Sequence, residues 1–261
     1  MIEKRQLAAL VAGLTLLGGC SSAAPASAPA STAASAPATA APGTAESVDA
    51  LMARMVAAQA GVKTYTMTMD TKTAVGGADV SMTMKGVVDQ SDPANVKMKI
   101  NSTIAGMATK MLQVDGERYM QMALTGGKWV KLPKDQAGEF ESTAGSTDFA
   151  GTLDSIKSSV KSIESLGEES VEGVKTTHHR LTIDTAALSK LGQSEGTLGA
   201  DTFVYDVWLD DASLVRKVAM DLTMKADGKS VPLKVTGLMG GYNEPVTIVA
   251  PSADEITKMP G

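Results

Sequence analysis

Apolar and polar residues alternate along several short stretches of the chain. Over residues 65–73, for example, Met67 and Met69 alternate with threonines. A period of two places every second side chain on the same face of a strand, so such a stretch predicts a strand with one apolar face. The same pattern recurs over residues 80–88, 96–104, 118–124 and 216–225. These strands predict an antiparallel sheet that is covered on one face and meets water on the other.

Short pairs that contain glycine separate the predicted strands. Asp115-Gly116 lies between residues 108–114 and 118–124, and Asp227-Gly228 lies between residues 216–225 and 230–238. Gly76-Gly77 separates two earlier strands, and Gly126-Gly127 precedes a strand over residues 128–132. Such pairs supply the positive backbone angles of tight hairpins. The predicted topology is therefore a meander in which neighbours along the chain pair with one another.

Apolar residues at helical spacing predict a few helices. The helix over residues 46–60 places Val48, Leu51, Met52, Met55 and Val56 on one face and ends at Gly61. A helix over residues 148–165 places Phe149, Leu153, Ile156, Val160 and Ile163 on one face. A short helix is predicted over residues 184–191, and Ser252 with Glu255 predicts a capping box near the C-terminus. The helices should pack on the apolar face of the sheet, which makes the predicted fold α+β.

The first twenty residues have the features of an export signal. Lys4 and Arg5 precede an apolar run from Leu7 to Leu17, which is too short to span a bilayer. The run ends in Leu17-Gly18-Gly19-Cys20, which resembles the bacterial lipobox. We interpret residues 1–19 as a lipoprotein signal peptide and Cys20 as the lipid anchor. The alternative is an ordinary signal peptide followed by a cysteine that is there by chance.

Residues 21–45 are almost entirely Ala, Ser, Pro and Thr and carry no charge. Without large apolar side chains they cannot offset the entropy of ordering, so residues 20–45 are predicted to be a disordered tether with a lipidated first residue. Cys20 is the only cysteine, so the domain that follows, residues 46–261, has no internal disulfide. One acyl chain anchors weakly, and a diacylglyceryl group would supply the two chains that stable attachment needs.

Composition and charge narrow the classes of function. The chain has 16 methionines but only 3 Phe, 2 Trp and 4 Tyr. Without Glu3, Lys4 and Arg5, the 24 basic and 29 acidic side chains become 22 and 28, a net charge of −6. An acidic domain without a basic run is a poor candidate for binding nucleic acid. After Leu17 no apolar run is long enough to cross a membrane.

Catalytic motifs are present only as fragments. The two histidines, His178 and His179, are adjacent on a predicted strand and would point to opposite faces, where we expect surface positions. With no other His or Cys in the domain, a metal site or another cofactor is not expected. Ser158 and Lys161 match Ser-x-x-Lys without its companion motifs, and we interpret them as a solvated helix face. Gly228-Lys229-Ser230 lacks the earlier glycine of a phosphate loop. We therefore predict that the chain is not an enzyme.

Three stretches resemble a known family. They are Val114–Tyr119 with Lys128–Val130, Tyr205–Asp210 with Leu214–Lys217, and, most specifically, Tyr242–Pro251. With the lipobox, they resemble the actinobacterial LppX/LprA/LprF/LprG lipoproteins, relatives in fold of the LolA/LolB carriers. The resemblance covers the whole domain. It implies a strongly curved antiparallel sheet, a half barrel, with helices on its concave face around an apolar cavity that takes acyl chains.

The resemblance also implies a function, the carriage of a lipid or glycolipid across the cell envelope. The expected partners are that ligand, the membrane through the anchor on the extracytoplasmic side, and an envelope transporter; the protein should be a monomer. The predicted cavity lining is Met67, Met69, Met82, Met84, Met98, Ile100, Met120, Met122, Val218, Met220, Leu222 and Met224, with Leu51, Met55, Leu153, Ile156 and Val160 on the helices above it. Alternatively, these residues form a closed core in a tethered protein-interaction or sensing domain.

Overall fold

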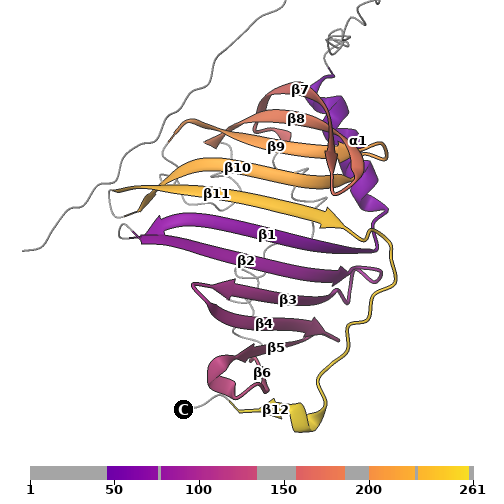
Figure 1. Cartoon of the computed structure of the whole chain (residues 1–261). Helices are drawn as coiled ribbons and strands as arrows, with labels where there is room; N and C mark the ends of the chain where they lie inside the picture. The colour runs from indigo at the N-terminus through magenta and orange to yellow at the C-terminus, as the bar shows by residue number, and fades with distance from the viewer. Residues whose placement is uncertain (1–45, 76–77, 134–156, 186–199, 227–228, 259–261) are drawn as a thin grey trace, which may run out of the picture. The chain divides into compact units, whose positions relative to one another are not determined.

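The computed structural model describes residues 46–75, 78–133, 157–185, 200–226 and 229–258 (Figure 1). One α-helix, α1 (Val48–Ala60), precedes a long series of strands. The strands are β1 (Thr64–Val75), β2 (Ala78–Asp89), β3 (Lys97–Ile104), β4 (Met107–Val114), β5 (Glu117–Met122), β6 (Trp129–Lys131), β7 (Val160–Val171), β8 (Val174–Asp184), β9 (Thr202–Asp210), β10 (Val215–Ala226), β11 (Lys229–Gly240) and β12 (Ile256–Thr257). Two short 3₁₀ helices are η1 (Ala123–Thr125) and η4 (Ala253–Glu255).

All twelve strands belong to one large, curved sheet in the order β12-β6-β5-β4-β3-β2-β1-β11-β10-β9-β8-β7 (Figure 1). Neighbours along the chain pair antiparallel, as the hairpin signals predict, from β1 to β6 and from β7 to β11. The pairing of β1 with β11 joins these two meanders, and β12 adds a short parallel pair to β6. The order begins at β12 and finishes at β7, so the sheet is unclosed within the described residues.

Tight turns connect the strands where the sequence predicts them. Asp115 and Gly116, between β4 and β5, have φ values of 53° and 72°. This is the left-handed region that a two-residue hairpin turn requires. Val75 pairs with Ala78, and Ala226 pairs with Lys229, so the strands pair directly on both sides of two further predicted turns, whose own residues lie outside the described ranges. Two further turns of this kind, Ala105-Gly106 and Glu172-Gly173, were not predicted.

The predicted first helix is confirmed as α1. The Ser47 side chain caps it by accepting a hydrogen bond from the backbone N–H of Ala50 at 3.2 Å. Leu51, Met52 and Met55 are completely buried, which agrees with the predicted apolar face. The helix ends at Gly61, whose backbone N–H donates to a carbonyl group of the last turn. Gly61 itself does not adopt a left-handed conformation.

The predicted helix over residues 148–165 is wrong in its second half. Residues 160–165 form the first half of β7, an edge strand that pairs with β8. Its register shifts between Val160 and Ser162 and again between Ser165 and Gly167. A β-bulge of this kind disturbs the alternation of side chains, which explains why Val160 and Ile163 have a helix-like spacing. Residues 148–156 lie outside the described residues.

Two further helical predictions differ in outcome. Asp184, the predicted start of the short third helix, is the last residue of β8, while residues 186–191 lie outside the described part of the chain. The capping box is confirmed: the Ser252 N–H and hydroxyl both donate to Glu255 Oε2, at 2.9 and 2.8 Å. It caps the N-terminus of η4, which is a 3₁₀ helix rather than an α-helix.

The prediction that one face of the sheet is entirely exposed to solvent is wrong, because the C-terminal segment, residues 241–258, covers part of that face. This segment leaves β11 at the centre of the sheet and reaches the β6 edge (Figure 1). Ile248 packs in a small cluster with Leu112, Val114 and Tyr119, and Ile256 contacts the same cluster. These strand residues alternate with the methionines, so they belong to the opposite face of the sheet. An apolar patch on the predicted polar face is therefore buried by the chain's own terminus.

Candidate functional site

The strand register places the predicted lining residues on a single face. Residues directly opposite one another in adjacent strands point to the same side of a sheet. Met69 of β1 lies opposite Met84 of β2 on one side and Gly237 of β11 on the other, and Gly237 in turn lies opposite Val218 of β10. Following the pairs across β2–β5, β10 and β11 gathers Met67, Met69, Met82, Met84, Met98, Ile100, Met120, Met122, Val218, Met220, Leu222 and Met224 on one face. We call this surface the methionine face.

Burial varies strongly across the methionine face. Met84, Met98 and Ile100 are at most 6% exposed and belong to a core cluster that lies mostly on the strands β1–β4 and also includes Val62 and Leu132. Met67, Met69 and Met120 pack against that cluster but are only half-buried. The remaining predicted lining residues of β2, β5 and β10, apart from Val218, are also half-buried. Apolar side chains thus continue from a closed interior to positions that solvent reaches.

Two glycines shape the centre of this face. Gly86 lies opposite Met67, and a Cβ atom at Gly86 would lie 2.7 Å from Met67 Cε. A Cβ atom at Gly237 would lie 2.8 Å from Val218 Cγ2. A glycine inside a strand often marks a close approach of this kind. Both glycines let neighbouring side chains lie flat against the sheet, and sequence reasoning missed them although each interrupts an alternating strand.

Helix α1 covers one end of the methionine face. Leu51, Met52 and Met55 pack in a cluster with Leu181, Ile183, Val207, Leu209, Val215 and Val218 from β8–β10. The half-buried Val160 contacts the same cluster. Of the helix residues predicted to lie over the cavity, Leu51 and Met55 are therefore core residues, and Leu153 and Ile156 lie outside the described residues.

Polar contacts hold α1 to the sheet. Arg54 donates to both carboxylate oxygens of Glu46, at 2.8 and 2.9 Å, and to the Ser213 hydroxyl at 2.7 Å. Arg54 Nη2 lies 3.5 Å from Nε2 of His179, which points toward the methionine face from β8. Burial, together with the nearby Arg54 charge, lowers the pKa of His179. His179 is therefore a buried neutral group, and its Nδ1 has no hydrogen-bond partner among the described residues.

The other histidine lies on the opposite face, as predicted, but it is also buried. His178 stacks on Trp208 with ring centroids 4.0 Å apart, and Glu169 accepts a 2.8 Å hydrogen bond from Trp208 Nε1. His178 Nδ1 is 3.0 Å from Glu169, and Nε2 is 3.3 Å from Asp206. The hydrogen bonds from Trp208 and His178 lower the pKa of Glu169. The expectation that both histidines are surface residues is wrong. His178 is buried by stacking on Trp208, and His179 is buried beneath α1.

The remaining candidate for nucleophilic chemistry has no catalytic geometry. The predicted helix face is wrong: Ser158 is exposed in the turn before β7, and Lys161 lies in β7, where its Nζ forms a 3.0 Å ion pair with Asp184. In the described ranges, no group of three His, Cys, Asp or Glu side chains is arranged to hold a metal ion.

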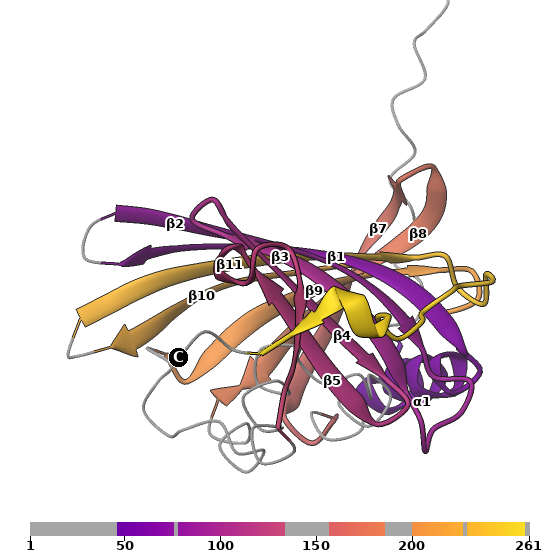
Figure 2. The ribbon, with the colours of Figure 1, turned by 90° about the horizontal axis from the view of Figure 1, so that it is seen from below.

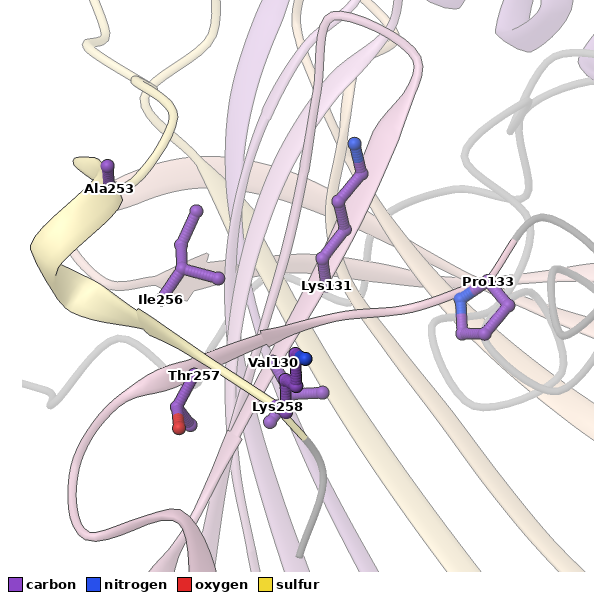
Figure 3. A pocket seen from close by; sticks show the side chains of 7 residues that line it. All are labelled: Val130, Lys131, Pro133, Ala253, Ile256, Thr257 and Lys258. Atoms are coloured by element: carbon purple, nitrogen blue, oxygen red, sulfur yellow. The ribbon is translucent and has the colours of Figure 1, made fainter.

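A cavity of about 670 Å³ lies at the sheet edge where β12 joins β6 (Figure 3). Its lining is mostly apolar, with two lysines: Val130, Lys131, Pro133, Ala253, Ile256, Thr257 and Lys258. Val130 lies opposite Met120, so the cavity adjoins the last strand of the methionine face. It is at the other end of the strand order from β7 and β8, beside which α1 packs (Figure 1).

Cys20 and the tether lie outside the described residues. Among the segments that are described, no helix combines the length and the apolar character needed to cross a bilayer.

Comparisons with known proteins bear on the fold. A family of unknown function, DUF6612, matches residues 47–172, slightly less than half of the chain. No curated protein sequence matches the chain. Two crystal structures have a similar fold. LprF from Mycobacterium bovis is 15% identical, with 80% of this chain and all of LprF aligned and a TM-score of 0.54.

The second is the Mycobacterium tuberculosis lipoprotein LppX. It is 17% identical, with 78% of this chain and all of LppX aligned and a TM-score of 0.50. At such identities the likeness concerns the fold alone. The chain therefore has the LppX/LprF-type lipoprotein fold that its sequence motifs predict.

Proposed function

We propose that this chain is a membrane-anchored extracytoplasmic lipoprotein that binds the acyl chains of a lipid or glycolipid and carries them across the cell envelope. The observation that carries the proposal is the methionine face, which gathers flexible apolar side chains from strands far apart in sequence. A structural core has no need to leave so many of them half-buried. We expect the bound chain to lie along the part of this face that α1 does not cover.

The chemistry of methionine suits such a ligand. Its side chain is unbranched and polarizable, and it repacks easily around apolar ligands of varied shape. A carrier must hide the acyl chain from water, because exposing about fifteen CH₂ groups costs about 12 kcal/mol at 0.8 kcal/mol each. A surface of adaptable apolar side chains can replace the bilayer interior without fixed polar partners.

The proposed anchor is a lipid on Cys20, with residues 21–45 as the tether. We predict that Cys20→Ala releases the protein from the membrane fraction, because the lipid is then lost. Cell fractionation and immunoblotting measure this directly. Unchanged fractionation of the Cys20→Ala chain would show that something other than this cysteine holds the protein at the membrane.

Native mass spectrometry of the full chain, purified in detergent from its bacterial host, tests lipid binding. The expected spectrum contains the protein together with a non-covalent lipid that solvent extraction removes. A mass without any bound lipid, under several detergents, would contradict the proposal. It would instead favour a tethered protein-interaction or sensing domain with a closed core.

A further inference from the structure

One end of the methionine face carries an exposed apolar row. Met107 is 70% exposed and Ile104 is 39% exposed, and both lie at the tip of the β3–β4 hairpin. Leu124, in η1 directly after β5, is 83% exposed. Large apolar side chains with this much exposure are typical of surfaces that contact another apolar phase. We call Met82, Ile104, Met107 and Leu124 the apolar lip.

The apolar lip is continuous with the interior. Ile104 lies opposite both Met82 of β2 and Met107 of β4, so the three side chains form a row across adjacent strands. Two residues further along β2, on the same face, Met84 is only 6% exposed. An acyl chain could therefore pass from the lip to the buried part of the methionine face without leaving apolar surface.

Exposed lysines lie at this end of the sheet. The last residue of β1, the first of β2, the β3–β4 hairpin, the last residue of β10 and the first of β11 lie at the end of the sheet opposite the one where β11 runs into the C-terminal segment (Figure 1). The η1 turn follows β5 at this same end. Lys110 follows Met107 by three residues, and Lys225 and Lys229 flank the β10–β11 tip. All three are exposed, and none forms an ion pair with a described carboxylate. Asp79 is an exposed carboxylate at the same end, and Asp227 lies between Lys225 and Lys229 in the sequence.

We propose that the apolar lip docks onto an anionic bilayer surface and is the place where an acyl chain passes between the bilayer and the methionine face. This inference rests on the proposed lipid-carrying function. Protruding apolar side chains with exposed lysines at the same end of the sheet fit the boundary between acyl chains and anionic headgroups. In a domain whose net charge is negative, lysines without ion pairs at this end favour an anionic partner. Figure 2, seen from below, shows the ends of β2, β10 and β11 at one side of the sheet and α1 at the other.

The single cysteine of the chain allows a direct test. Met107→Cys and Leu124→Cys each introduce a thiol for a polarity-sensitive fluorophore, and the unsubstituted chain measures any labelling at Cys20 itself. The matched control is Val249→Cys, since Val249 is also apolar and 69% exposed but follows Ile248, which packs on the opposite face of the sheet. The labelled full-length proteins are reconstituted through their anchor into vesicles of equal parts phosphatidylglycerol and phosphatidylcholine.

The expected result is a blue-shifted emission at positions 107 and 124, with quenching by spin-labelled acyl chains, and neither effect at position 249. Vesicles of phosphatidylcholine alone should weaken both effects. The Lys110→Glu, Lys229→Glu double variant should also weaken them, and Lys175→Glu, at the β7–β8 hairpin, should not. We expect Met107→Ser with Leu124→Ser to slow the transfer of a fluorescent fatty acid from vesicles about tenfold or more, because two apolar contacts are lost.

Labels at 107 and 124 that stay as solvent-exposed as the label at 249 would overturn the inference. If lipid still co-purifies with such proteins, the proposed function survives and only the docking site is wrong. Absence of lipid from every variant, and from the unsubstituted chain, would defeat the proposed function itself. A blue shift that appears without vesicles and only at high protein concentration would mean that the apolar lip contacts other copies of the chain. That result would also overturn membrane docking.

Discussion

The two parts of the methionine face are built from different residues. Beneath α1 the sheet contributes branched aliphatic side chains, among them Leu181, Ile183 and Val207, which are at most 1% exposed. On β1–β5 the corresponding positions are mostly methionines, and several of them, including Met67 and Met69, are half-buried. Branched side chains have few rotamers and pack rigidly, whereas methionine has three rotatable bonds and adapts.

This difference separates stability from binding. The part under α1 closes a core and should determine whether the sheet stays folded. The methionine-rich part should tolerate substitution more easily and decide what the protein binds. Substitutions in the two parts should therefore have opposite profiles, with large effects on unfolding in one part and large effects on ligand content in the other.

Leu51→Ala should have the largest effect on stability. Leu51 is completely buried between α1 and the sheet, and loss of a buried leucine leaves a cavity that costs about 3 kcal/mol. Urea denaturation followed by circular dichroism measures this change in the free energy of unfolding. Met69→Ala, at a half-buried position, is the matched comparison and should cost about 1 kcal/mol. Equal losses for both variants would remove the distinction between the two parts.

Met69→Lys should strongly reduce bound lipid, because it places a charge on the surface where we propose that acyl chains lie. We expect the lipid that co-purifies to fall by about tenfold or more, and Met84→Lys to act in the same direction at a more buried site. Thr68→Lys provides the control, since Thr68 is the next residue of β1 and points to the opposite face. Lipid extraction and mass spectrometry give the ratio. A folded Met69→Lys protein with unchanged lipid would refute our assignment of the binding face.

Gly86→Ala should have a moderate effect. The added Cβ atom would meet Met67 Cε at 2.7 Å, so the methionine side chain must move away from the sheet. We expect a loss of about 1 kcal/mol in the free energy of unfolding and a change in the preferred acyl-chain length. Gly240→Ala is the comparison, because its Cβ atom would meet only Thr66 Oγ1 at 3.9 Å. Identical chain-length preferences in the two variants would mean that Gly86 does not shape the site.

The smallest expected effect is a pH dependence from His179. Burial and Arg54 lower its folded-state pKa below the ordinary value of 6.5. Below pH 6.5 the unfolded chain therefore takes up a proton that the folded chain does not, and stability falls as the pH decreases toward the folded-state pKa. Thermal unfolding between about pH 7.5 and 5.5, roughly one unit on each side of the ordinary histidine pKa, measures this loss of stability. His179→Gln should make the melting temperature less dependent on pH in this range. An unchanged pH dependence in this variant would mean that another group causes it.

Particular elements show why much of the fold could be predicted. In β1 and β2 the methionines alternate with polar residues over residues 66–70 and 81–85, and Gly76-Gly77 between the strands predicts a tight turn, so both strands and their pairing follow from local pattern. Residues 160–165 show the limit. Their register contains two bulges, and a bulged edge strand loses the period of two that identifies a strand.

The candidate site was predictable only in part. The alternation correctly groups Met67 with Met69, and the register confirms that the other predicted strand residues share their face. It could not identify Gly86 and Gly237, because their importance comes from side chains on neighbouring strands. It also could not reveal that Trp208 and Glu169 enclose His178, since those contacts join three separate strands.

The sequence by itself determined the strands with their apolar sides, most of the hairpins, the first helix and the resemblance to LppX and LprF, because these depend on neighbouring residues along the chain. Only the tertiary structure decided that β1 pairs with β11, that the C-terminal segment buries part of the opposite face, and that the apolar lip stays exposed. Burial depends on which distant segments cover a side chain, and a local pattern contains no information about that.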